Sequence, residues 1–400
     1  MDLTGYLRAD GRKGIRNLVV VAYLVECAHH VAREIVLPQR ELGVHLIGFP
    51  GCFPNTYAHQ MMENICTHPN VGAVLLVSLG CESFNRPKLM ESIAASGRPV
   101  ETLVIQESGG TRRTIAQGRA WVQQARQQLD QQQRVTMGLE ELVVGTICGG
   151  SDATSGLTAN PAIGLTFDRL VENGATCIFE ETGELIGCEQ HLARRSVTPE
   201  LGVAVIASID KARACYDTLG HGSFANGNAE GELTTQEEKS MGAYAKSGSG
   251  TLHGIINPGE RPTHPGLYLL DVVPEGEVRF GFPNIVDNAE IGELIAGGCH
   301  LILFSTGRGS VVGSAVSPVI KICSNPQSFE RLSDDMDLNA GAILNGLTTL
   351  PEVGLQLFQL VLDTMVGKKT RSEDLGHQEF ILTYKSFEPL GPGCLPSSAY

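Results

Sequence analysis

The sequence predicts an α/β protein: a Rossmann-like parallel-sheet domain at the N-terminus, followed by a larger α/β domain. Three observations lead to this fold class. Short apolar runs alternate with amphipathic segments in the first third of the chain, a second such series follows, and a glutamine-rich stretch at residues 123–133 lies between them. Apolar strands that alternate with helices are typical of βαβ units and parallel sheets. We therefore expect a Rossmann-like α/β domain over residues 1–135 and an α/β catalytic domain over residues 136–400.

The first domain is predicted to contain four strands separated by helices. The strands are expected at residues 18–24, 44–49, 71–79 and 100–106. The helices are expected at residues 57–66, at residues 88–95 and from residue 111 onward. Alanine and glutamine favour helix, so the last of these helices should run into the glutamine-rich boundary.

The second domain repeats the alternation with longer helices. Its strands are expected at residues 142–147, 175–179, 268–272, 299–304 and 318–323, and its helices include residues 161–171, 290–296 and 352–366. Thr234 or Thr235 followed by Glu237 or Glu238 resembles a capping box and predicts a helix start. Residues 220–232 are rich in Gly, Asn, Ser and Ala, a composition that favours a loop near a site.

Composition and charge exclude several classes of protein. The 400 residues are 42% hydrophobic with a formal net charge of -14, which disfavours binding to nucleic acid or to an anionic membrane. The sequence shows no secretory signal and no apolar run long enough to span a bilayer. Eleven cysteines without a CxxC pair fit free thiols in a reducing compartment. We therefore expect a cytoplasmic protein.

Three cysteines come directly after predicted strands, and each has a glycine neighbour. They are Cys52, Cys81 and Cys148. In an open parallel sheet the carboxyl ends of the strands meet at one edge, where ligands bind, so three thiols there suggest a soft-metal site. A free cysteine is also often a small buried hydrophobe. Position alone leaves both interpretations open for these three, whereas Cys177, Cys299 and Cys323, inside apolar strands, are expected in the core.

Other polar groups follow the same strands. Glu82, Gly110, Thr111, Ser151, Asp152, Glu181 and Glu184 all lie at predicted strand ends. Carboxylates beside a metal can act as ligands and as a general base, although Asp152 and Glu184 suit helix caps equally well. Lys239 and Lys246 flank a helix, and a buried lysine can act as a base or bind an anion.

Two segments suit anion binding. Thr306, Gly307 and Arg308 offer backbone amides and a guanidinium in one loop after a strand, a receptor for carboxylate or phosphate. The glycine spacing there is a weak match to a dinucleotide turn. Arg12 and Arg16 belong to a locally basic N-terminal cluster, which could equally be a solvated face.

Several of these segments occur in long, unusual strings. They include Gly5-Tyr6-x-Arg8-x-Asp10-Gly11-Arg12-x-Gly14-x-Arg16-Asn17, Leu79-Gly80-Cys81-Glu82, Gly109-Gly110-Thr111, Cys148-Gly149-Gly150-Ser151-Asp152, Ala159-Asn160-Pro161-Ala162, Glu238-Lys239-Ser240 and Thr306-Gly307-Arg308-Gly309. From residue 5 to about residue 380 the chain resembles the altronate/galactarate dehydratase family.

The resemblance implies a metal-dependent carbon-oxygen hydro-lyase. It would remove water from a sugar acid such as altronate or galactarate and give a 2-keto-3-deoxy acid. A divalent metal is implied, and we expect iron, as a single ion or an iron-sulfur cluster. A related branch eliminates sulfite from sulfolactate, and this alternative stays open. A third alternative is a non-catalytic subunit that binds substrate or acts as a scaffold.

The strand-end positions and the resemblance together select the candidate site residues. We expect catalysis by Glu181, Lys239 and Asp152, and metal ligation by Cys52, Cys81, Cys148 and Glu82. Substrate binding is expected from Arg12, Arg16, Asn17, Gly110, Thr111, Ser151, Asn160, Thr306, Gly307 and Arg308.

Partners follow from the same resemblance. Single-chain members of the family carry a small domain ahead of the Gly-Tyr-x-Arg motif, whereas this chain begins at that motif. We therefore expect a large subunit with a separate small subunit, a small acidic substrate and a homo-oligomer. Glu230 and Glu232 replace a more basic family segment, which predicts a changed substrate preference.

Overall fold

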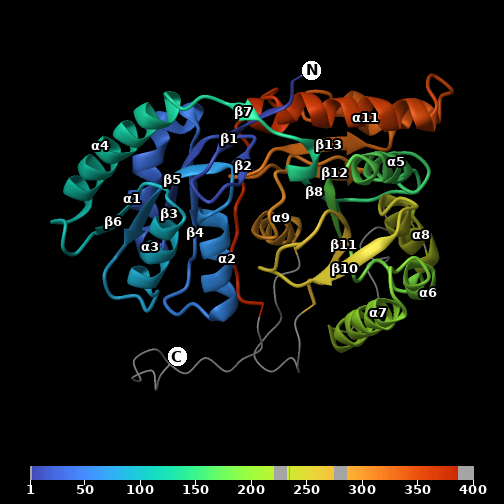
Figure 1. Ribbon diagram of the computed structural model, residues 1–400, viewed down its shortest axis with the longest axis horizontal. Helices are drawn as coiled ribbons and strands as arrows, with labels where there is room; N and C mark the ends of the chain where they lie inside the picture. Colours follow the sequence, from blue (N-terminus) through green and yellow to red (C-terminus); the bar gives the residue numbers. More distant parts are fainter. Residues whose placement is uncertain (1, 220–231, 234, 274–285, 386–400) are drawn as a thin grey trace.

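The computed structural model describes residues 2–219, 232–233, 235–273 and 286–385. Residues 220–231, most of the segment expected to form a loop near a site, lie outside the described residues. The described part folds into two parallel sheets, each covered by helices (Figure 1). The predicted α/β fold class is therefore confirmed.

The first sheet forms from the valine- and leucine-rich runs of the first 105 residues, because β-branched side chains pack well on a pleated surface. Its strands run parallel in the order β4-β3-β5-β6. They are β3 (Leu18–Tyr23), β4 (Val44–Gly48), β5 (Val71–Ser78) and β6 (Val100–Val104). All four expected strands are present, and their ends differ from the prediction by one or two residues.

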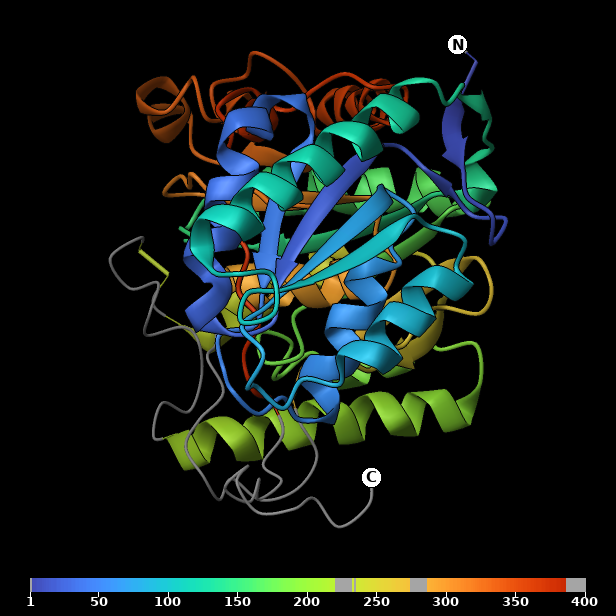
Figure 2. The ribbon, with the colours of Figure 1, turned by 90° about the vertical axis from the view of Figure 1, so that its left-hand side faces the viewer.

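Helices cover both faces of this sheet. Helices α1 (Glu26–Val36) and α4 (Thr111–Asp130) pack on one face, and α2 (Thr56–Cys66) and α3 (Arg86–Ala95) pack on the other (Figure 2). In α4, Val122, Ala125 and Leu129 are buried at helical spacing, so the glutamine-rich helix does present an apolar face to the sheet.

A small antiparallel sheet that the sequence did not suggest connects the two halves. Its strands are β1 (Thr4–Leu7), β2 (Lys13–Gly14) and β7 (Val135–Thr136), in the order β2-β1-β7. Thr4 pairs with Thr136 and Gly5 with Val135. The first strand is thus fixed beside the segment that leads from the first parallel sheet to the second.

The second parallel sheet has the order β10-β11-β9-β8-β12-β13-β14 in the described residues. Its strands are β8 (Val143–Cys148), β9 (Thr176–Glu180), β10 (Leu252–Ile256), β11 (Gly266–Leu270), β12 (Leu301–Thr306), β13 (Val319–Cys323) and β14 (Leu338–Asn339). Strands β10 and β14 were not predicted. The helices are α5 (Ala159–Glu172), α6 (Glu189–Ala193), α7 (Pro199–Leu219), α8 (Gln236–Lys246), α9 (Asp287–Ala296), α10 (Pro326–Arg331), α11 (Leu350–Met365) and α12 (Arg371–Asp374).

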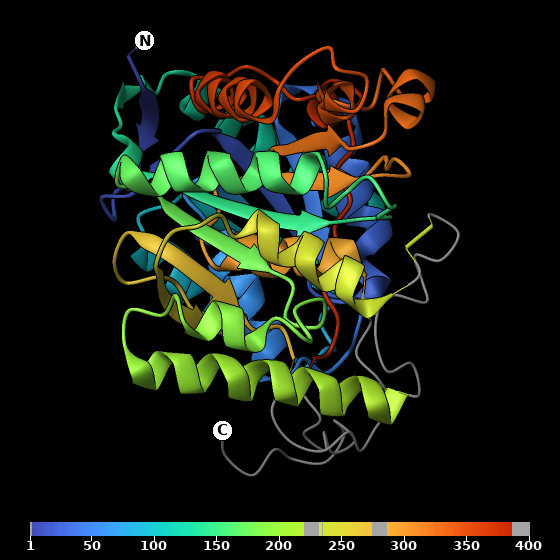
Figure 3. The same cartoon turned by 90° about the vertical axis from the view of Figure 1, so that its right-hand side faces the viewer.

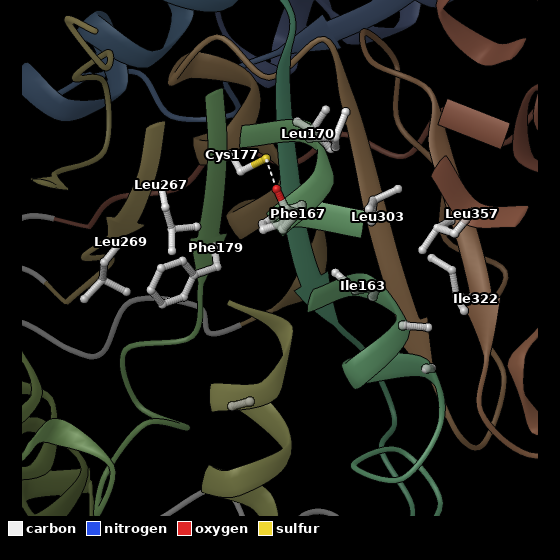
Figure 4. Packing of buried hydrophobic residues seen from close by; sticks show 14 of the residues in the cluster. Ile163, Phe167, Leu170, Cys177, Phe179, Leu267, Leu269, Leu303, Ile322 and Leu357 are labelled. Carbon is white, nitrogen blue, oxygen red and sulfur yellow. Dashed lines mark hydrogen bonds between the residues drawn. The ribbon is translucent and has the colours of Figure 1, made fainter. Parts of the chain in front are cut away.

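One face of the second sheet is covered by α5, α11 and α8 (Figure 3). Figure 4 shows Ile163, Phe167 and Leu170 of α5 against the apolar side chains of the strands. Cys177 is buried in this layer, with its sulfur 4.0 Å from the Phe167 carbonyl oxygen. Cys299 and Cys323 are buried as well, so the core positions expected for these three cysteines are confirmed.

Helices α2 and α9 lie side by side between the two sheets and join them through one apolar core (Figure 1). The core combines Met62 of α2, Leu294 of α9 and Phe304 of β12. Leu382, near the end of the described chain, is buried in the same core, and the ring of Tyr384 lies 5.4 Å from that of Phe49. The C-terminal segment therefore runs through the space between the sheets.

No helix in the described ranges has the length and apolarity needed to cross a membrane.

Candidate active site

The loops after β8 and β12 pack closely at the carboxyl edge of the second sheet. The backbone amides of Gly307 and Arg308 each donate to the Gly150 carbonyl at 3.0 Å. A Cβ atom at Gly307 would lie 2.2 Å from the Asp152 side chain. Only glycine allows this approach, so Gly307 lets the two loops pack directly against each other.

A buried lysine bridges these loops to helix α8. Lys239 Nζ donates to Cys148 Sγ at 3.0 Å and to Ser151 Oγ at 3.0 Å, and lies 4.0 Å from Glu184 Oε1. The helix starts with a capping box between Thr235 and Glu238, as the sequence predicted. Lys239, Cys148 and Ser151, three of the expected site residues, are thereby brought together.

Lys246 lies two helical turns after Lys239 on the same face of α8 and is fully buried. It forms an ion pair with Glu181, which follows β9, and its charge interacts with Cys148. Both lysines of α8 therefore converge on the end of β8, and Glu181 lies beside them.

Burial and neighbouring charges shift the pKa values of these groups in opposite directions. Burial raises the pKa of Cys148, but the ammonium groups of Lys239 and Lys246 outweigh it and leave that pKa below its usual value. For Lys239, burial lowers the pKa, while Cys148 and Glu184 outweigh it, so the net shift is upward. The two shifts favour the thiolate form of Cys148 and the ammonium form of Lys239. The pKa of Lys246 is lowered, chiefly by burial.

Further buried carboxyl groups form a wall beside this cluster. Burial and the charge of Glu290 raise the pKa of Glu180 well above its usual value. Burial raises the pKa of Glu290 itself to about 8, against the opposing charge of Lys385. Glu290 is therefore mostly protonated at neutral pH, and the environment of Glu180 favours its protonated form as well. In that form the two side chains can donate hydrogen bonds or a proton.

Glu293, one turn after Glu290 on α9, has two close partners. Lys385 Nζ lies 2.9 Å from Glu293 Oε2, and the Tyr57 hydroxyl donates to Oε1 at 2.6 Å. The side chains of Lys385 and Glu293 are 4% and 0% exposed. The C-terminal segment thus places the Lys385 ammonium group beside the buried carboxyl groups of α9.

A hollow of about 440 Å³ opens on the same loops. Its walls are Asp152, Ala153, Thr154, Glu232, Arg308, Asn325, Ser328 and Arg331. Two guanidinium groups in one hollow suit an anionic substrate. Asp152 is nearly buried here, accepts from Thr154 N at 2.9 Å and from Asn325 Nδ2 at 2.9 Å, and so holds the shape of the loop.

Other expected substrate-binding residues lie away from this hollow. Arg16 forms a bidentate ion pair with Glu373 at 2.6 and 2.8 Å, and Arg12 pairs with Asp10 at 2.7 Å. Arg16 and Arg12 line two different cavities. Asn17 accepts from Arg8 and donates to the Leu129 carbonyl. The structure does not bring these three together with Arg308, and their contact with substrate stays a prediction.

The remaining expected positions divide between the two sheets. Gly110, with φ 86°, and Thr111 begin α4 after β6 of the first sheet. Asn160 is buried on α5, and its Oδ1 has no hydrogen-bond partner in the ranges described above. Thr306 Oγ1 donates to the Gly150 carbonyl at 3.2 Å and accepts from Gly309 N, which places it in the packed loops of the candidate site.

The expected metal ligands do not gather into one set. Cys52 and Cys81 are exposed on neighbouring loops of the first sheet, whereas Cys148 is buried beside Lys239. Glu82 accepts from Gly80 N at 2.9 Å and lies 4.0 Å from Arg86. Among the described residues, no group of three or more His, Cys, Asp or Glu side chains could hold a metal ion. These residues do not fit a three-thiol iron site, and iron stays a prediction that the chemistry below does not use.

The sequence reasoning missed part of the acidic wall. Glu290 and Glu293 lie one turn apart in a helix that is otherwise apolar from Ala289 to Ala296, and carboxylates in such a segment are a signal that could have been noticed. Lys385 and Tyr57 carry no comparable signal, because only the fold brings them to α9.

Buried proton-carrying side chains beside a hollow lined by two arginines, at the carboxyl edge of a parallel sheet, define an α/β enzyme. The family match is with D-galactarate/Altronate dehydratase, C-terminal, over residues 139–387, and D-galactarate dehydratase/Altronate hydrolase, second domain, over residues 5–130. The chain belongs to this family of sugar-acid dehydratases and related lyases.

Individual relatives agree with this assignment. The chain is 33% identical to the (2R)-sulfolactate sulfo-lyase subunit beta of Chromohalobacter salexigens, over 95% of this chain and 96% of the relative. It is 33% identical to the galactarate dehydratase (L-threo-forming) of Escherichia coli, over 92% of this chain and 74% of the relative. It is 30% identical to the altronate dehydratase of Escherichia coli, over 92% of this chain and 74% of the relative.

Proposed function

We propose that this enzyme removes water from a polyhydroxy acid such as galactarate or altronate and releases a 2-keto-3-deoxy acid. The observation that carries the proposal is the buried cluster of Lys239, Cys148, Lys246 and Glu181 beside the arginine-lined hollow. Dehydration next to a carboxylate needs an anion receptor, a base and an acid, and this edge of the sheet holds all three.

Substrate binding is assigned to the hollow. Arg308 and Arg331 both line it, and a planar guanidinium can hold a carboxylate by two parallel hydrogen bonds. Lys239, whose charge is favoured by Cys148 and Glu184, would stabilise the negative charge that develops on the substrate carboxylate as the adjacent proton leaves.

Proton abstraction is assigned to the Lys246-Glu181 pair. Burial lowers the pKa of Lys246, which favours the neutral amine that a base requires. The base takes the proton from the carbon next to the carboxylate, and the electron pair of that C–H bond forms a carbon-carbon double bond.

The hydroxyl leaves the neighbouring carbon together with a proton from a neutral carboxyl group, and Glu180 and Glu290 are the candidate donors. The resulting enol becomes the ketone by proton transfer alone. The balance is one water lost, with no oxidation or reduction.

The test is to incubate the purified protein with galactarate and with altronate and to measure keto-acid release. We expect product with at least one acid, and a large loss in Cys148→Ala and Lys246→Met. Full activity in Cys148→Ala would overturn the assignment of this cluster. If that activity were found only together with a co-purified small partner, it would favour a chain that only binds substrate or scaffolds a complex.

A second candidate is elimination of sulfite from sulfolactate. The match to a sulfo-lyase subunit beta over almost the full length of both chains favours it. The same base would remove the proton beside the carboxylate, and sulfite would leave in place of hydroxide. Sulfite and keto acid in equal amounts from sulfolactate, without product from the sugar acids, would select this function.

We also propose a small partner subunit and a cytoplasmic location. The name of the relative, a subunit beta, supports the first, and free thiols at ten described cysteines fit a reducing compartment. Affinity purification from the native cell at low salt should recover a small protein in equal amounts. Metal analysis of the same anaerobic preparation tests the iron prediction directly.

A further inference from the structure

A cluster of arginines lies at the opposite edge of the second sheet, away from the candidate active site. Arg12 and Arg98 both pair with Asp10, at 2.7 and 3.0 Å. Arg8 and Arg261 complete the cluster, and neither pairs with a carboxylate of the described chain. The cluster therefore holds four guanidinium groups and one carboxylate that pairs with them, Asp10, in a protein whose net charge is -14.

Arg261 is the least satisfied of the four. Its Nε is buried and has no hydrogen-bond partner in the described ranges. One terminal nitrogen makes only long contacts, 3.4 Å to the Asn64 carbonyl and 3.5 Å to Thr67 Oγ1. Burying a cationic donor without a partner is costly, so this arrangement indicates a missing anion.

The electrostatics agree with the geometry. Burial and the charge of Arg12 lower the pKa of Arg261 to about 10. Burial and the charge of Arg98 lower the pKa of Arg8 to about 9. Nearby His300 adds no negative charge, and burial lowers its pKa to about 4, so it is neutral at pH 7. At Arg261, burial and the charge of Arg12 thus outweigh the opposing charges of Asp10 and Glu63.

Arg261 and Arg12 line a cavity of about 330 Å³ at the start of the strands. Val143 and Thr176, the first residues of β8 and β9, form part of its wall. Lys13 also lines it but is paired with Glu141 at 2.9 Å, and Glu140 lies at the rim. The volume is at the lower end of the range of small-molecule pockets, about 300–1,000 Å³.

We propose that this cavity is a second binding site, which takes a small molecule bearing an oxyanion, carboxylate or phosphate, on Arg261 and Arg12. A guanidinium binds either group by paired hydrogen bonds. The site lies a full strand length from Cys148, so its occupant is separate from the substrate. The inference does not depend on the proposed function.

The experiment uses the full chain and two probes, inorganic phosphate and succinate, against sodium chloride at equal ionic strength. Calorimetric titration and thermal unfolding are measured on the wild type, on Arg261→Gln and on Arg33→Gln, an exposed arginine of α1 with a side chain 50% exposed. We expect at least one probe to bind and stabilise the wild type and Arg33→Gln. Arg261→Gln should weaken binding by about tenfold or more.

In chloride alone, Arg261→Gln should be at least as stable as the wild type, because it removes repulsion with Arg12. Equal destabilisation in every buffer would indicate a purely structural role and overturn the proposal. So would unchanged probe binding in Arg261→Gln, or binding lost in Arg308→Gln instead, which would place the anion in the hollow of the candidate active site. None of these results bears on whether the protein dehydrates an acid.

Discussion

The ammonium nitrogen of Lys239 lies 3.0 Å from the sulfur of Cys148, although 91 positions separate the two residues in the chain. The contact joins helix α8 to the end of strand β8, and both side chains are nearly inaccessible to solvent. An ammonium and a thiolate in this setting attract strongly because little water screens them.

Lys239→Met should abolish most of the activity. The change removes the cation that faces the developing negative charge and leaves Cys148 without its closest partner. We expect kcat to fall by about 100-fold or more, within the range typical for loss of such groups. Initial rates of keto-acid release measure it. Lys368→Met, at a side chain 56% exposed, is the matched control and should keep wild-type rates. Equal rates in the two variants would contradict the assignment.

Arg308→Gln should weaken substrate binding more than it slows the chemical step. A hydrogen bond to a charged group contributes about 1.5–3 kcal/mol, so KM should rise by roughly 10- to 100-fold. Steady-state kinetics with the active acid, once identified, give both constants. A drop in kcat with KM unchanged would show that Arg308 does not hold the substrate carboxylate.

Glu290→Gln should change how stability depends on pH. The pKa of Glu290 is about 8 in the folded protein, above the ordinary glutamate value of 4.5, so the folded state keeps a proton that the unfolded chain has released between these values. The contribution of this group to stability is full below pH 4.5 and falls as pH rises towards 8, by about 1.4 kcal/mol per pH unit at most.

Glutamine does not titrate, so the variant should gain stability relative to the wild type as pH rises from 5.5 to 8. Urea unfolding at both pH values measures the difference. Glu91→Gln, at an exposed site on α3, is the control. Its free energy of unfolding should differ from that of the wild type by the same amount at both pH values. If the difference in free energy of unfolding between Glu290→Gln and the wild type does not grow with pH, the Glu290 carboxyl is not protonated in the folded state.

Lys385→Met should destabilise the protein by about 3–5 kcal/mol, because it leaves Glu293 buried without its cation. The double variant Lys385→Met/Glu293→Gln should recover much of this loss. Denaturant unfolding of the four proteins gives the coupling energy. Additive effects would rule out a direct interaction between the pair.

The strands of both sheets were predictable from sequence, because apolar runs such as residues 71–78 and 301–306 can be buried on both faces only in a parallel sheet. Strand β10 was missed because His253 and Gly254 interrupt its apolar pattern. The pairing of β1 with β7 was missed because β7 has only two residues and leaves no periodic signal.

The candidate site was predictable only in part. The rule that ligands bind at strand carboxyl ends selected Cys148, Ser151, Glu181 and Arg308, and the structure places all four at that edge. The same rule grouped Cys52 and Cys81 with Cys148, although they end strands of a different sheet. A pattern along the chain cannot tell which strands share a sheet, and that information determines which thiols can meet.

Residues 379–385 run between the two sheets, and Lys385 is the group that offsets Glu293 there. During translation, the strands of the first sheet leave the ribosome early and can assemble at once. A nascent chain that ends near residue 300 already carries Glu293 but lacks the Lys385 ammonium group that pairs with it. Closure of the interior must therefore wait until residue 385 has been synthesised, so truncated products of this gene should accumulate as protease-sensitive, chaperone-bound forms.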